Sequence, residues 1–324
     1  MSAVPLISVV ICSRDRPASL RQTLASLAAM TVPAGLDWEV LVVDNATTPP
    51  LDAGALATTL PLRIVREPRA GLSHARNRGV AAARGRYLCW TDDDVIVGAQ
   101  WLAGYADAFV RHPAAAVFGG PVVPRLSEPA VGWVATAAAI PALAGFVAAR
   151  DFGTHEFALQ ADDPRQPWGA NFAVRSDVQR RYAYDPGRGA GSGAVPLGEE
   201  SEVIARMLQG GASGWWLPAV RVEHVIGAER QTMRYFLSYF RAAGVTAARV
   251  RSGDAVARPS SLARWPTTVL QAIHTLAGPF ARAVTAAPRG GLGLRLLARH
   301  AFIGGLLGAD GGEHGGHDAQ PDVA

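Results

Sequence analysis

The sequence predicts an α/β fold with a mostly parallel central sheet flanked by helices, followed by a C-terminal helical extension. Three observations carry this prediction. Apolar, β-branched runs alternate with helix-like segments along the first 125 residues. The runs are apolar at nearly every position, as in strands that are buried on both faces of a parallel sheet. Polar residues, many of them acidic, follow these runs where strands would end.

Each predicted element of this half has a local reason. The strands are continuous apolar or β-branched runs, and they span residues 6–12, 38–46, 62–68, 86–94 and 115–123. The first helix begins at Pro17, because proline suits the first turn of a helix. The second spans residues 71–85, where Ser73 would cap its start and Gly85 would end it. Alternation at these lengths predicts right-handed crossovers between parallel strands.

The C-terminal part of the chain has a different character. Residues 229–308 contain apolar segments edged with arginine, and we predict helices there. Such helices could lie on a membrane surface, pack on the domain or form a homodimer interface, since amphipathicity alone does not choose a partner. Residues 129–149 are uncharged and long enough to span a bilayer, but Pro141 and internal glycines favour a helix on the domain or at the membrane surface. Residues 309–324 are expected to be disordered.

Composition narrows the class of protein. With 324 residues, 49% of them hydrophobic and 18% charged, the chain can bury a substantial core. Its formal net charge of +4 is too weak to indicate nucleic acid, although it suits an anionic small ligand or membrane face. Cys12 and Cys89 lie in apolar runs and form no disulfide framework. Because the N-terminus lacks a signal-peptide pattern, we expect a cytoplasmic protein, free or peripheral on the cytoplasmic face of the membrane.

Three adjacent aspartates, Asp92, Asp93 and Asp94, end the fourth predicted strand. Side chains alternate along an extended segment, so Asp92 and Asp94 would point one way and Asp93 the other. Two convergent carboxylates repel each other unless a cation lies between them, and Mg²⁺ or Mn²⁺ typically binds one or two carboxylates together with phosphate oxygens. The cluster therefore predicts a divalent-metal site shared with a diphosphate. The alternative is a solvated turn in which Asp93 or Asp94 caps the next helix.

Polar residues also follow the other predicted strands. Residues 13–15 (Ser-Arg-Asp) follow the first, residues 44–45 (Asp-Asn) the second and Glu67 the third. Parallel strands place their carboxyl ends at one edge of the sheet, where α/β proteins bind their ligands. We therefore expect carboxylates from four strands to converge in space.

An ordered set of segments resembles the family 2 glycosyltransferases. The segments run along roughly two thirds of the chain, and they are LISVVICSRDRPASLRQTLASL, WEVLVVDNA, RAGLSHARNRGVAAARGRYLCWTDDDV, WGANFAVR and LGEESEVIARML. The resemblance implies the Rossmann-like GT-A fold over residues 1–228, with a donor half over about 1–125 and an acceptor half over about 126–228. It implies a metal-dependent, inverting transfer of a sugar from a nucleoside-diphosphate sugar to the hydroxyl of a glycan, lipid-linked or small-molecule acceptor.

The resemblance also implies roles for individual residues. The residues expected at the donor nucleotide are Ser13, Arg14, Asp15, Asp44, Arg76, Asp92 and Asp93. Those expected at the Mg²⁺ or Mn²⁺ ion are Asp92, Asp94 and His224, with Asp94 as the direct ligand. Those expected on the acceptor side are Gly169, which allows close backbone approach, Asn171 and Glu199.

Glu200 is the candidate catalytic base. An inverting transfer needs one base to take the proton of the attacking hydroxyl, opposite the leaving diphosphate. Glu199 and Glu200 stand at the start of a predicted helix over residues 197–208, and the family's base is normally the second acid of such a pair. A glutamate departs from the family's commoner aspartate. The alternative is that both acids only stabilise the helix dipole.

The other assignments have structural alternatives that the sequence leaves open. They are a helix cap for Asp15, a turn with Asn45 for Asp44, a helix-surface position for Arg76 and Arg78, a backbone-binding amide for Asn171, a satisfied half-buried histidine for His224, and core packing for Trp215 and Trp216.

Two other functions would share these features. A nucleotidyltransferase that makes nucleotide-sugars would have the same strand-end carboxylates. It normally carries a glycine-rich, lysine-containing loop after the first strand, and residues 12–17 (CSRDRP) contain neither. A non-catalytic subunit of the same fold is the second alternative, and the intact Asp92, Asp94 and Glu200 count against it.

Overall fold

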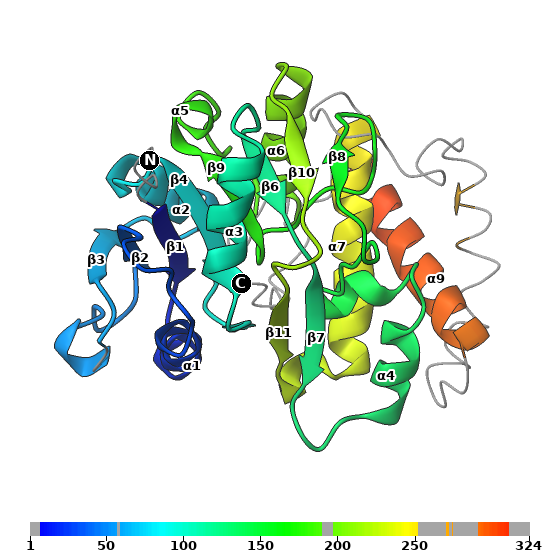
Figure 1. Ribbon diagram of the computed structural model, residues 1–324. Coiled ribbons are helices and arrows are strands. Elements are labelled where there is room, and N and C mark those ends of the chain that lie inside the picture. The colour runs from blue at the N-terminus through cyan, green and yellow to red at the C-terminus, as the bar shows by residue number, and fades with distance from the viewer. Residues whose placement is uncertain are drawn as a thin grey trace.

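The computed structural model describes residues 7–56, 59–189, 197–251, 270–271, 274 and 291–310. A mixed eight-stranded sheet with the order β3-β2-β1-β4-β9-β6-β10-β8 forms its centre. Helices lie on both of its faces, and a three-stranded sheet with the order β5-β11-β7 adjoins it (Figure 1). The predicted α/β layering is therefore confirmed.

The elements have the following bounds. The large sheet contains β3 (Leu62–Glu67), β2 (Trp38–Asn45), β1 (Ile7–Ser13), β4 (Tyr87–Asp92), β9 (Phe172–Arg175), β6 (Val117–Gly119), β10 (Gly214–Trp216) and β8 (Phe157–Leu159). The small sheet contains β5 (Val95–Val97), β11 (Val222–Ile226) and β7 (Val122–Leu126). The helices are α1 (Pro17–Ala28), α2 (Leu72–Ala82), α3 (Trp101–Arg111), α4 (Gly132–Ala138), α5 (Ser176–Gln179), α6 (Glu199–Gln209), α7 (Met233–Arg251) and α9 (Gly291–Asp310), with short 3₁₀ turns η1 (Gly54–Leu56), η2 (Ala144–Val147) and η3 (Ala228–Arg230).

Strands β3, β2, β1 and β4 are parallel neighbours, as predicted. Their register brings Ser13 opposite Asp44 and Cys12 opposite Asp92, so the carboxyl ends lie at one edge of the sheet. Alternate residues of β1 pack into different cores: Val9 joins the cluster formed with α1 and α3, whereas Val10 joins the cluster formed with α2 and α6. Burial on both faces explains why these strands are apolar throughout.

Two local predictions are wrong in informative ways. The predicted strand at residues 115–123 divides into β6 and β7, which belong to different sheets; Pro121 lies between them and has no N–H to donate to a ladder. Ser73 does not cap α2, because Gly71 occupies the N-cap position with φ 128° and the Ser73 hydroxyl donates to the carbonyl of Arg188. Gly85 lies beyond the helix end, where a Cβ would come within 2.4 Å of a β1 backbone nitrogen.

The segment of residues 129–149 lies on the domain, which was one of the two favoured predictions. It forms α4 and η2, whose Val134 and Phe146 pack with Phe236 of α7 and Leu294 of α9 in a separate apolar cluster. Within the described residues, no helix is long and apolar enough to cross a membrane. Most of the chain between α7 and α9, and residues 311–324 of the predicted disordered tail, lie outside the described residues.

Candidate active site

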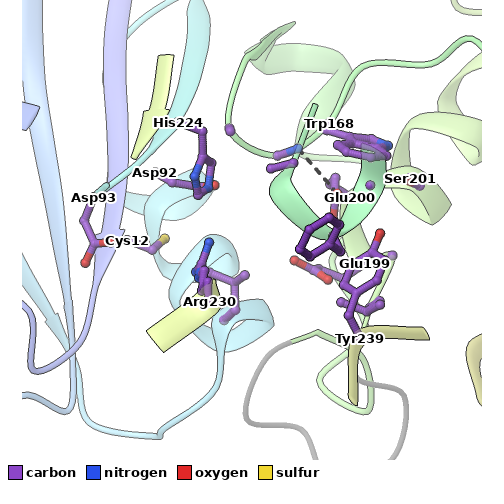
Figure 2. Close-up of a pocket in the computed structure, with 18 of the residues that line it drawn as sticks. Cys12, Asp92, Asp93, Trp168, Glu199, Glu200, Ser201, His224, Arg230 and Tyr239 are labelled. Atoms are coloured by element: carbon purple, nitrogen blue, oxygen red, sulfur yellow. Dashed lines mark hydrogen bonds between the residues drawn. The ribbon is translucent and has the colours of Figure 1, made fainter. Parts of the chain in front are cut away.

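A cavity of about 280 Å³ lies beyond the carboxyl ends of β1 and β4 (Figure 2). It is walled by elements that are distant in the sequence. The strand ends contribute Cys12, Asp92 and Asp93, α2 contributes Arg76, the loop before β9 contributes Trp168 and Gly169, α6 contributes Glu199 and Glu200, β11 contributes His224, η3 contributes Arg230, and η2 and α7 contribute Phe146, Tyr235 and Tyr239. The fold thus collects most of the predicted metal, acceptor and base residues around one space.

Asp92, Asp94 and His224, the three predicted metal ligands, lie close enough together to hold an ion, and they are called the metal-ligand cluster below. One ligand atom from each residue lies within 4.8 Å of the others, and His224 Nε2 is 3.3 Å from Asp94 Oδ1. Asp94 Oδ1 and His224 Nδ1 are buried without a hydrogen-bond partner among the described residues. Unpartnered buried polar atoms are costly, and carboxylates with an imidazole are ordinary ligands for divalent cations. The residues therefore fit a divalent ion.

Backbone pairing holds His224 against the aspartates. Strand β11 is antiparallel to β5, with His224 opposite Val95, and the N–H of Val225 donates a 2.8 Å hydrogen bond to the carbonyl of Asp94. These bonds join a strand near residue 224 to the turn after β4. Because the strand pairing that brings His224 to the aspartates is long-range, the sequence around His224 alone does not show that it lies beside them.

Two arginines for which the sequence predicted no role compensate the charge of Asp93 and Asp94. Arg16 bridges Asp93 and Asp94 at 2.8 and 2.9 Å, and Arg230 Nη2 lies 3.4 Å from Asp94 Oδ2. The Ser13 hydroxyl donates a 2.6 Å hydrogen bond to Asp93. The predicted alternation of side chains is thus only partly realised: β4 ends at the first aspartate, and the turn lets one guanidinium reach both later carboxylates.

The electrostatic environment differs among the aspartates. Burial and the neighbouring Asp94 carboxylate raise the pKa of Asp92 above its ordinary value. Burial also acts to raise the pKa of Asp94, but His224, Arg230 and Arg16 outweigh it and lower that pKa. Burial raises the pKa of Asp93 as well, against the opposing charge of Arg16. The charges of Asp92 and Asp93 are therefore less compensated than that of Asp94.

Arg76 joins the two glutamates at the start of α6. Its Nη1 lies 2.8 Å from Glu199 Oε1 and 3.4 Å from Glu200 Oε2, and only the Glu200 side chain, at 15%, is appreciably exposed. Burial and Glu200 raise the pKa of Glu199, against the opposing charge of Arg76. The surface alternative for Arg76 is wrong, and its described ionic partners are these glutamates.

Gly169 permits a close approach, as predicted, but the group that approaches it is the side chain of Arg76. A Cβ at this position would come within 2.3 Å of Arg76 Nη2. The Gly169 N–H also donates a 3.4 Å hydrogen bond to Glu200 Oε1, which Figure 2 marks. The glycine therefore lets the loop before β9 press against the ion pair that orients the predicted base.

The loop after β1 lies outside the cavity. Arg14 and Asp15 are largely exposed and 3.5 Å apart, and Asp15 has φ 55°. Asp15 does not cap α1, because Arg16 is the N-cap residue and makes no side-chain cap bond. The cap alternative for Asp15 is wrong, and the nucleoside-binding roles of Arg14 and Asp15 stay predictions.

Asp44 is buried and engaged by its own neighbourhood. It accepts hydrogen bonds from the backbone N–H groups of Thr47 and Leu51 and from Arg66 at 2.6 Å. The predicted turn therefore exists, closed onto Thr47 instead of Asn45. Asp44 does not line the described cavity, so its contact with a nucleoside also stays a prediction.

The predicted acceptor-binding role of Asn171 is wrong. Its Oδ1 accepts from the indole of Trp101 and the hydroxyl of Tyr105, and its Nδ2 donates to the carbonyls of Pro121 and Val220. A primary amide offers two donors and two acceptor positions, so this buried side chain has none left for an acceptor sugar. Its role is structural.

The two tryptophans of β10 also serve the fold. Trp216 is buried against Phe152 and Phe157, and Trp215 stacks on His112 at 4.0 Å between ring centroids. The tryptophan that lines the cavity is instead Trp168, whose ring lies 4.7 Å from the Arg150 guanidinium. Trp168 directly precedes Gly169 in the segment WGANFAVR, and this position is the signal in the sequence that could have indicated a place at the cavity.

Comparison with known proteins identifies the fold. The model of glycosyl transferase family 2 matches residues 8–177. The chain is 36% identical over 129 residues to the succinoglycan biosynthesis protein ExoM of Rhizobium meliloti, which is 37% of this chain and 41% of that protein. It is 29% identical over 96 residues to the uncharacterized glycosyltransferase EpsJ of Bacillus subtilis, covering 28% and 26% of the two chains. The matches therefore span less than half of either relative.

Solved structures match over more of the chain. The mannosyltransferase PcManGT of Pyrobaculum calidifontis, in complex with GDP-Man and Mn²⁺, superimposes with a TM-score of 0.56 at 15% identity, over 96% of this chain and 88% of that one. Residues 1–349 of S. aureus TarS in complex with UDP give a TM-score of 0.52 at 15% identity, over 94% and 90%. At such identities the likeness shows the fold, which is GT-A, as the sequence predicted.

Proposed function

The chain belongs to glycosyl transferase family 2, and on this premise we propose that it transfers a sugar from a nucleoside-diphosphate sugar to an acceptor hydroxyl, with inversion at the anomeric carbon. One observation carries the proposal: Asp92 and His224 of the metal-ligand cluster line the same cavity as Glu200, from the opposite wall (Figure 2). An inverting transfer requires its base to lie opposite the leaving diphosphate.

Asp92, Asp94 and His224 are the residues that would hold a Mg²⁺ or Mn²⁺ ion. Such an ion, when bound, offsets the charge that develops on the leaving diphosphate. The support from this chain is that Asp94 Oδ1 and His224 Nδ1 are buried and accept or donate no hydrogen bond among the described residues. Among the structural neighbours, PcManGT was solved with Mn²⁺.

Glu200 accepts the proton of the attacking hydroxyl. The hydroxyl oxygen forms the new bond to the anomeric carbon, the bond from that carbon to the diphosphate oxygen breaks, and the diphosphate leaves with the electron pair. Glu200 suits this role because its side chain is more exposed than those of Arg76 and Glu199. Hydrogen bonds from Arg76 and from the Gly169 N–H hold it in place. Glu199, closer to Arg76, acts as a positioning residue.

The acceptor side of the cavity is aromatic. Trp168 lies beside Glu200, and Tyr239 and Phe146 come from α7 and η2 (Figure 2). An aromatic face suits the apolar face of a sugar ring, so we favour a glycan or glycolipid acceptor. Solved neighbours carry GDP-Man and UDP-GlcNAc, which makes GDP- and UDP-sugars the first donors to test.

The test is turnover by the full chain in MnCl₂ with a panel of UDP- and GDP-sugars, measured as release of nucleoside diphosphate with and without added saccharides. We expect Glu200→Gln to lower transfer by about 10²–10⁴-fold while nucleotide binding is retained. Glu202→Gln is the matched control, since Glu202 is on the same helix and pairs with Arg206 away from the cavity. Transfer by Glu200→Gln near the parental rate would show that the base assignment is wrong.

A further inference from the structure

The cations around the aspartates are not equivalent. Arg16 is held by two carboxylates, at 2.8 Å from Asp93 and 2.9 Å from Asp94, and it does not line the cavity. Arg230 lines the cavity and reaches Asp94 at the longer distance of 3.4 Å. Arg16 therefore bridges two carboxylates outside the cavity. Arg230 contacts Asp94 and also faces the cavity in which a ligand would bind.

The position of Arg230 in the fold supports this difference. It ends η3, the short turn between β11 and α7, and its guanidinium lies 5.9 Å from the ring of Tyr235, which also lines the cavity. Figure 2 shows Arg230 below His224, with Glu199 and Glu200 to its right. Its side chain is 7% exposed, so Arg230 is a nearly buried cation at the wall of the cavity.

We propose that Arg230 is a diphosphate-binding residue that pairs with Asp94 in the ion-free protein and moves to the donor's diphosphate when a divalent cation occupies the metal-ligand cluster. This inference rests on the proposed function, because it takes the ligand to be a metal-bound nucleoside diphosphate.

Charge balance is the physical reason. Without an ion, Arg16 contacts Asp93 and Asp94, and Arg230 contacts Asp94. A divalent cation bound to Asp94 would lie within a few ångströms of the Arg230 guanidinium, and like charges at that range repel strongly in a buried site. A diphosphate supplies anionic oxygens to which a guanidinium binds with charge-assisted hydrogen bonds.

The coupling must be reciprocal. If Arg230 disfavours the cation in the absence of diphosphate and binds the diphosphate in its presence, each ligand strengthens the binding of the other by the same factor. Removing the guanidinium should therefore move two affinities in opposite directions, which a residue that only supports the fold would not do.

The experiment measures both affinities by titration calorimetry for the full-length parent, Arg230→Gln and Arg230→Lys. Mn²⁺ is titrated alone, and UDP, GDP, ADP and dTDP are titrated in saturating Mn²⁺. For Arg230→Gln we expect Mn²⁺ alone to bind more tightly by up to about tenfold, and the nucleoside diphosphate to bind more weakly by about tenfold or more. Arg230→Lys keeps the charge and should fall between the two. Arg221→Gln changes an exposed arginine directly before β11 and should match the parent.

The outcomes separate the two proposals. A parent that binds none of UDP, GDP, ADP and dTDP with Mn²⁺ would overturn the proposed function. A parent that binds one of them, with Arg230→Gln weakening both affinities or changing neither, would overturn only the role of Arg230. Opposite shifts in Arg230→Gln, absent in Arg221→Gln, would support it, and near-ultraviolet circular dichroism of each variant checks that it is folded.

Discussion

Replacing Arg76 by methionine should destabilise the protein by an amount that depends on pH. Arg76 and Glu199 are both almost fully buried and 2.8 Å apart, with Glu200 as a second carboxylate at 3.4 Å. Methionine fills much of the volume but leaves the two acids without their cation. Breaking a buried pair by removing one partner typically costs about 3–5 kcal/mol, and we expect this cost near neutral pH.

Protonation of Glu199 sets the pH dependence. Burial and Glu200 already raise the pKa of Glu199 in the parent, and loss of Arg76 should raise it further. In the window between the ordinary glutamate pKa and this raised value, the folded state binds more protons than the unfolded state, so stability falls as pH rises. The parent shares this fall up to the raised Glu199 pKa of about 8 that it already has. The cost of Arg76→Met should therefore be smaller at about pH 7 than at about pH 10, with a limiting slope of about 1.4 kcal/mol per pH unit.

Urea unfolding, followed by tryptophan fluorescence at both pH values, measures the loss of unfolding free energy caused by Arg76→Met. Arg78→Met is the matched control, since Arg78 is exposed on the same helix and should cost less than about 0.5 kcal/mol at either pH. In the double variant with Glu199→Gln, part of the loss should be recovered, because the acid no longer needs a cation. Equal losses in Arg76→Met and Arg78→Met, or a loss that does not grow with pH, would refute the reasoning.

Three further predictions concern the cavity. Asp92→Asn should weaken Mn²⁺ binding by about tenfold or more, measured by electron paramagnetic resonance of free Mn²⁺, because one ligand and one charge are lost; unchanged binding would place the ion elsewhere. Gly169→Ala should lower the stability by about 1–3 kcal/mol in thermal unfolding, since the new Cβ would meet Arg76 Nη2 at 2.3 Å, and a neutral effect would mean that the guanidinium yields freely. Trp168→Ala should lower transfer to a saccharide by about tenfold with little change in donor hydrolysis, whereas Trp215→Ala should alter neither; equal effects of the two would argue against an aromatic acceptor wall.

Much of the donor half could be predicted from local patterns. The apolar run at residues 7–11 and the aspartates that follow β4 specify a buried parallel strand and an acidic strand end, because side-chain period and strand termination are local properties. The two glutamates at the start of α6 were identifiable in the same way. The sequence did not reveal that residues 115–123 would divide between two sheets, since that depends on pairing with β11.

By itself, the sequence determined which residues end the strands and begin the helices, and therefore which carboxylates could meet at one edge. Only the tertiary structure decided how each charge is compensated: that Arg76 pairs with the glutamates of α6, that Arg16 and Arg230 pair with the aspartates, and that Asn171 is saturated by the core. The physical reason is that ion pairs and buried hydrogen bonds form at distances of about 3 Å, between residues whose proximity no local pattern encodes.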